Sequence, residues 1–107
     1  MTSSSGPALS VGRGVIREVA RLAALEVPEV LRVARSGPPW RVALAGSPIH
    51  VRVRAGEVSL RLWLVARPGA DLADASARVR RAVRTAVERL LGLEVRAVTV
   101  VIDGVGG

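Results

Sequence analysis

Hydrophobic positions recur at helical spacing in two stretches of the chain. Residues 14–27 carry apolar side chains on one face and charged ones such as Arg17 and Glu18 on the other, and Pro28 predicts the end of this helix. A second helix is predicted to begin after Asp71, a suitable N-cap, and to stop at Gly92, a suitable C′ residue. Its apolar stripe comprises Leu72, Ala75, Val79, Ala82, Val83, Ala86 and Leu90.

Apolar and polar residues alternate strictly in residues 49–54 and again from Val58 to Leu64, and Ala55-Gly56 lies between them. This pattern predicts a β-hairpin. A last strand is expected over residues 94–102, and its apolar residues on both faces predict a central strand, paired on both sides.

Two segments are less regular. Residues 30–34 fit either a short strand or an extended connection. Residues 36–48 are rich in proline and glycine, so we expect a loop there, with a short extended piece at residues 40–45.

The order of elements is helix, hairpin, helix, strand. We therefore expect an α+β fold, a two-layer sandwich with two main helices on one face of a small mixed sheet. A single domain is expected over residues 14–105, after a flexible N-terminal tail at residues 1–13 that is rich in serine and glycine. The apolar runs are much shorter than a membrane span requires, so no transmembrane segment is predicted.

The chain lacks Cys, Lys, Tyr, Asn and Gln and has one His, so most nucleophiles, bases and metal ligands are absent. We expect no enzymatic activity, no cofactor and no structural metal. All sixteen positive charges are Arg, and the net charge of +7 suggests a polyanionic partner. A coding bias of a GC-rich genome, or a composition poor in thermolabile residues, explains the arginine content equally well.

Several residues have both a functional and a structural interpretation. His50 could act as a base beside a carboxylate such as Glu57, but an exposed strand residue is the simpler interpretation. Asp71 and Asp74 could form a carboxylate pair, yet their position favours helix capping. No strand and no fuller glycine fingerprint precede residues 12–14, so they indicate a phosphate-binding turn only weakly. Residues 104–107 fit G-x-x-G but do not lie between two helices, as the nucleic-acid clamp of that form requires.

Trp63 is the strongest candidate for an interaction residue. Alternation places it opposite the leucines, so it lies on a face that two helices would leave open, or else under residues 36–48 beside Trp40. The candidate interaction surface comprises Trp63, Val65, Arg61 and Arg67.

The outer face of the second helix is a candidate anion patch of Arg78, Arg81, Arg84 and Arg89. It could track phosphates, which makes a small nucleic-acid-binding domain for RNA or DNA the alternative function. A solvated helix face is the simpler interpretation, because no aromatic residue is interleaved for stacking on bases or for seating this helix in a bilayer. No direct membrane insertion is expected.

Two segments resemble the alkaline-shock-protein family of bacterial envelope stress-response proteins. They are VIREVARLAALEVPEV at residues 15–30, and residues 57–105, with an alternating strand, a V-x-x-A-V helix, an L-G-L-x-V corner and a terminal V-x-V strand. The resemblance implies a non-enzymatic cytoplasmic scaffold or partner-binding protein in envelope stress response or homeostasis.

The resemblance also implies homo-oligomers and a protein partner that can be membrane-anchored, so that any membrane association runs through the partner. No catalytic residues are established for the family, and none are assigned here. The chain departs from the family at Pro68-Gly69, where Tyr-Gly is common, and in lacking an acidic tail.

Overall fold

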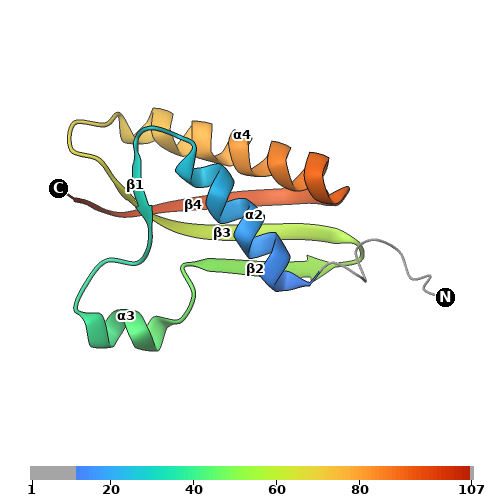
Figure 1. The fold of residues 1–107 in the computed structure, drawn as a ribbon, viewed down its shortest axis with the longest axis horizontal. Coiled ribbons are helices and arrows are strands. Elements are labelled where there is room, and N and C mark those ends of the chain that lie inside the picture. The colour runs from blue at the N-terminus through green and yellow to red at the C-terminus, as the bar shows by residue number, and fades with distance from the viewer. Residues whose placement is uncertain (1–11, 107) are drawn as a thin grey trace.

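The protein folds into two layers, seen in a computed structural model that describes residues 12–106 (Figure 1). The helical layer covers one face of a four-stranded mixed sheet, so the predicted α+β sandwich is confirmed. The elements in chain order are α2 (Arg13–Leu25), β1 (Val30–Val33), α3 (Pro39–Ala45), β2 (Ile49–Arg54), β3 (Glu57–Ala66), α4 (Leu72–Leu91) and β4 (Glu94–Val105). The predicted tail lies outside the described residues, except that Gly12 caps α2 and Arg13 already belongs to it.

The central strand is β3, which is hydrogen-bonded along both of its edges. One edge pairs with β4 in parallel, and the other pairs antiparallel with β2 and then with β1. At the junction, Ala34 N–H donates to Trp63 O at 3.0 Å and Trp63 N–H donates to Pro48 O at 2.9 Å. The strands β1 and β2 therefore form one interrupted strand, and the chain leaves the sheet between Ala34 and Pro48.

The excursion contains α3, so the prediction of a loop with an extended piece at residues 40–45 is wrong. Pro39 stands at the first helical turn, where a missing N–H costs nothing and the fixed φ suits a helix. The residues that follow are compatible with helix, and Gly46 ends it with a φ of 82°. The sequence-based prediction treated the prolines as helix breakers, although proline at the first helical position favours a helix.

The prediction that the last strand is central is also wrong, because β4 pairs with β3 alone among the described strands. Its two apolar faces have another cause, which is a β-bulge. Val95 pairs with Val58 but Ala97 pairs with Ser59, so Arg96 is an extra residue that reverses the alternation. Val95 therefore shares the helix-covered face with Val98.

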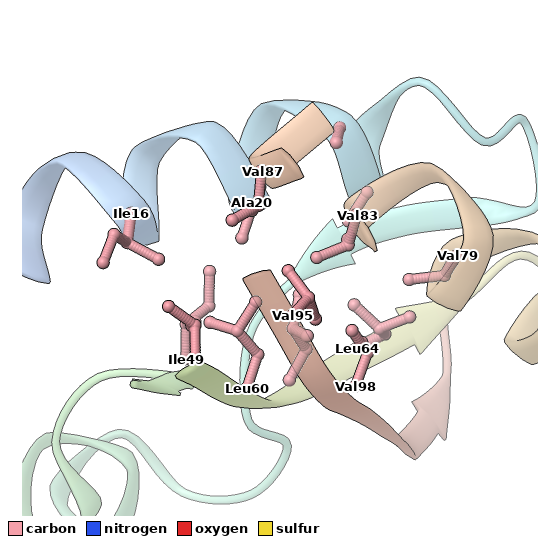
Figure 2. Packing of buried hydrophobic residues seen from close by; sticks show 14 of the residues in the cluster. Ile16, Ala20, Ile49, Leu60, Leu64, Val79, Val83, Val87, Val95 and Val98 are labelled. Carbon is pink, nitrogen blue, oxygen red and sulfur yellow. The ribbon is translucent and has the colours of Figure 1, made fainter. Parts of the chain in front are cut away.

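The core lies between the sheet and the two long helices (Figure 2). The helix α4 contributes Ala75, Val79, Val83 and Val87 at a spacing of four residues. They meet leucines and valines of β3, including Leu62 at the centre of the sheet. The predicted stripe is correct in its middle, but its ends at Leu72 and Leu90 are exposed.

Both predicted ends of α4 are confirmed. The Asp71 carboxylate accepts a hydrogen bond from Asp74 N–H at 3.1 Å, so Asp71 is the N-cap. Gly92 adopts the left-handed conformation with a φ of 67°, and its N–H donates to Glu88 O. These two caps fix where α4 begins after β3 and ends before β4. Because α2 and α4 both cover one face of the sheet, the other face has no long helix against it.

Candidate interaction surface

The face of the sheet opposite α2 and α4 is called the open face. Backbone register places its side chains in rows across the three strands, because partners at one level point to the same side. One row is His50, Arg61 and Thr99, and the next is Arg52, Ser59 and Ala97. Trp63 begins a further row beside Val101. The predicted placement of Trp63 opposite the leucines follows directly from this register.

Trp63 is partly buried in a cluster with Arg35 and His50. The Arg35 guanidinium lies over the indole, 3.7 Å from the ring centroid, and the His50 ring meets the indole edge-on at 4.8 Å between centroids. Arg35 Nη2 and His50 Nε2 are 3.3 Å apart. The alternative interpretation required Trp40 as the neighbour of Trp63. The neighbour is Arg35 instead, and its guanidinium covers the indole.

A depression of about 460 Å³ lies beside this cluster, on the open face and around the edge of β2, where Arg17 of α2 donates a hydrogen bond to Ile49 O at 3.3 Å. Polar lining residues include Arg17, His50, Arg52, Ser59, Arg61 and Thr99. Every charged side chain in the lining is cationic, and no carboxylate takes part. A second depression along the same face is lined by Arg52, Arg54, Arg96 and Glu57, where Arg96 and Glu57 form an ion pair at 3.5 Å. The open face therefore favours an anionic partner.

Two of the predicted interaction residues are engaged by other parts of the chain. Val65 is only 3% exposed, because the C-terminal segment passes over it: a Cβ built on Gly106 would stand 3.1 Å from Val65 Cγ1. Arg67 is exposed, but its Nε–H donates to Pro28 O at 2.9 Å, which ties the end of β3 to the turn after α2. Of the four predicted residues, Trp63 and Arg61 lie together on the open face.

The candidate anion patch on α4 is divided. Arg78 forms an ion pair with Glu29 at 2.6 Å, and Arg84 donates to Val95 O at 2.7 Å, so both hold α4 against other elements. Arg81 and Arg89 are exposed, and no ion pair engages them in the described part of the chain. Only two of the four guanidiniums remain for a ligand.

A groove lies between the end of α2 and α4. Its lining combines apolar residues with a mostly cationic rim: Val27, Pro28, Ala82, Ala86 and Leu90, with Arg78, Arg81, Arg89, Thr85 and Glu26. The groove is a secondary candidate surface, since two of its rim arginines are the free ones of the patch.

The remaining chemical candidates have structural roles or no partner for catalysis. His50 is exposed and contacts Arg35 and Trp63, and none of the hydrogen bonds among residues 12–106 joins it to a carboxylate. Asp74 forms a weak ion pair with Arg78 at 3.7 Å in the first turns of α4. Gly12 precedes α2 and Gly104 packs against Ser36, while Gly107 lies outside the described residues.

Within residues 12–106, no group of three or more His, Cys, Asp or Glu side chains is placed to hold a metal ion. None of the described helices is both long and apolar enough to cross a membrane. On α2, a hydrogen bond from Arg21 lowers the pKa of Glu18, and the same bond raises the pKa of Arg21. Both residues belong to the helical layer and so lie apart from the open face.

Sequence reasoning missed Arg35 and Arg52 as parts of the surface. Arg35 was overlooked because it follows a segment that had no assigned place in the sheet. Arg52 could have been found, since it alternates with the apolar residues of β2 in the way that His50 does.

Comparison with solved structures shows the fold. A variant of the MamM CTD in its manganese form has a TM-score of 0.57 at 15% identity, over 87% of this chain and 99% of that chain. Another variant in its copper form also has a TM-score of 0.57, at 14% identity over 87% of this chain and 98% of that one. Similarity at this level of identity concerns architecture alone. No curated protein matches the chain.

A family model matches residues 3–106, which is almost the whole chain. The match includes the two segments that carry the resemblance in the sequence, the first at α2 and the second from β3 to β4. The protein therefore belongs to the alkaline shock protein 23 family, whose function is cell envelope-related.

Proposed function

We propose that this protein is a non-enzymatic scaffold in cell-envelope homeostasis and that it binds an acidic protein partner through the open face. The observation that carries the proposal is the depression beside Trp63, whose charged lining residues are all cationic. Trp63, which contacts the lining residue His50, supplies an aromatic anchor next to that depression, and Arg61 and Arg52 supply charge. Aromatic residues and arginines of this kind dominate the energetics of protein interfaces.

The Arg35–Trp63 contact supports a role in binding beyond packing. Arg35 Nε is buried and has no hydrogen-bond acceptor among the described residues. A buried donor without a partner costs free energy, so its retention calls for an explanation. Placing a cation against the indole gives the surface both charge and apolar area at one point, which suits a carboxylate-bearing partner.

Self-association through the same face is a second arrangement, and its electrostatics differ. A two-fold contact brings each patch against its own copy, so Arg52 and Arg61 of one protomer would approach arginines of the other. Added salt screens that repulsion and should strengthen such a dimer, whereas it should weaken the binding of an acidic partner. The sign of the salt dependence therefore distinguishes a homo-oligomer from a partner complex.

Nucleic acid remains the alternative partner. The α4 patch gives it limited support, since Arg78 and Arg84 already engage Glu29 and the Val95 carbonyl. A nucleic-acid complex that used Arg81 and Arg89 would lose affinity steeply with salt and would not depend on Trp63.

The test replaces Trp63 by aspartate. We expect Trp63→Asp to lose the partner recovered from the native host in a pull-down, because the substitution removes the anchor and adds a repulsive charge. Light scattering of wild type and of Trp63→Asp, at low and at moderate salt, measures self-association. Leu90→Asp is the matched control, since Leu90 is 72% exposed on α4. A partner retained by Trp63→Asp and lost by Leu90→Asp would contradict the proposal.

A further inference from the structure

The short helix α3 has its large apolar side chains turned away from the protein. None of its seven residues is buried, and Trp40 and Leu44 are 61% and 81% exposed. These two are four positions apart, which places them about 40° apart around a helix that turns about 100° per residue. Val42, about 160° from each, is the one α3 residue that is partly buried. The usual arrangement of a surface helix is reversed here.

A helix of this length is not stable by itself in water, and most helical stability in proteins comes from packing of an apolar face. The α3 helix has little such packing, since Val42 alone is partly covered. Figure 1 shows it standing off the end of the sheet, apart from α2 and α4. Its outward apolar face therefore has a physical reason to be covered by something outside this chain.

The surrounding charges indicate what kind of surface covers it. Residues 30–50, from β1 through α3 to the start of β2, contain no Asp or Glu and carry Arg32, Arg35 and Arg41. One carboxylate contacts this stretch from outside, Asp103, which accepts a hydrogen bond from Ser36 N–H at 2.7 Å. Arg41 lies beside Trp40, with its guanidinium 5.4 Å from the ring centroid. Tryptophan and leucine next to arginines are typical of segments at the surface of anionic membranes, where the indole sits at headgroup level and arginine meets phosphate.

We propose that α3 is an interfacial arm that seats Trp40 and Leu44 in the surface of an anionic phospholipid bilayer. Arg41, beside Trp40, contacts a lipid phosphate. This revises the sequence-based expectation of no direct membrane insertion, which considered the second helix and treated α3 as a loop. The contact is peripheral and needs no spanning helix. This contact uses α3 and not the open face, so failure of this proposal would leave the proposed function unaffected.

A second copy of the chain is a poorer occupant. The groove between α2 and α4 is an apolar depression that could receive α3, but Arg78, Arg81 and Arg89 outnumber its one carboxylate, Glu26, so the groove as a whole repels Arg41. A lipid surface supplies negative charge in place of that repulsion.

The chain has two tryptophans, which makes the test specific. In Trp63→Phe, Trp40 is the sole tryptophan, and its emission should move to shorter wavelength when vesicles of phosphatidylglycerol and phosphatidylcholine are added. Wild-type protein should sediment with these vesicles and much less with phosphatidylcholine alone. Trp40→Ala/Leu44→Ala should bind the anionic vesicles at least about tenfold more weakly, because two apolar side chains are lost from the contact. Leu90→Ala, which shortens a leucine on α4 that is 72% exposed against 81% for Leu44, should bind as wild type does.

Four results would overturn the proposal. One is wild-type protein that stays in solution with anionic vesicles. Another is equal vesicle binding by wild type and by Trp40→Ala/Leu44→Ala. The third is a Trp40 emission that is unchanged by vesicles although the protein binds them, since that would place the contact elsewhere. Light scattering of the same double variant reports on a second copy as the occupant, and a dimer that dissociates with this variant would count against the lipid surface.

Discussion

Replacing Leu62 by alanine should lower the free energy of unfolding by about 2–5 kcal/mol. Leu62 is fully buried in β3, where it pairs with Ile49 on one side and Val100 on the other, beneath the helical layer. The substitution removes apolar contacts and leaves a cavity between sheet and helices. A typical domain is stable by only about 5–15 kcal/mol, so the loss should be visible as a large decrease in the urea midpoint.

Leu90→Ala is the matched control for Leu62→Ala, because the same side chain is shortened at a position that is 72% exposed. Its effect on unfolding should stay within about 0.5 kcal/mol. Equal destabilisation by the two variants would mean that the core does not lie between β3 and the helices.

The second large effect concerns the open face. We expect Arg52→Glu/Arg61→Glu to lower the affinity for the acidic partner by a factor on the order of 100, because each substitution turns an attraction into a repulsion at one interface. Both arginines line the depression beside Trp63, so both charges change within one contact area. Affinity of purified partner and protein, measured by titration calorimetry at fixed salt, reports the change.

The control for this charge reversal is Arg81→Glu/Arg89→Glu, which makes the same change in net charge on α4. Both arginines are exposed there, and they form no ion pair among the described residues. If net charge alone governed binding, the two double variants would lose affinity equally. A loss confined to Arg52→Glu/Arg61→Glu locates the contact on the sheet.

Much of the helical layer could be predicted from local signals. Asp71 caps α4, the apolar positions recur with helical spacing, and Gly92 supplies the left-handed stop. The hairpin was equally clear, since Ala55 and Gly56 both take the positive φ that a tight turn needs. Each of these features is set by residues close together in the sequence, which is why they were predictable.

The features that were missed depend on residues far apart or on a break in the pattern. Arg96 is an unpaired extra residue in β4, so strict alternation would put Val95 and Val98 on opposite faces, although they share one. The pairing of β1 and β2 with one edge of β3 is a property of the whole sheet, and so is the approach of Arg35 to Trp63. Val65 was placed on the correct face by alternation, but the segment around Gly106 covers it.

The two residues at the centre of the candidate site were therefore predicted, but the groups around them were not. Trp63 and Arg61 could be found because strand alternation is local. The cation over the indole and the acid-free depression required the topology. Predicting α3 would have required using the rule that proline at the start of a helix favours the helix.

The most direct test of the central claim is a map of backbone amide chemical shifts on the isotope-labelled protein, recorded as the purified partner is added. We expect the perturbed amides to cluster on the open face, around His50, Arg61 and Thr99. The amides of Arg81 and Arg89 on α4 should change little. Perturbations confined to α4 and the end of α2, with the open face unchanged, would contradict the assignment of the open face as the partner-binding surface.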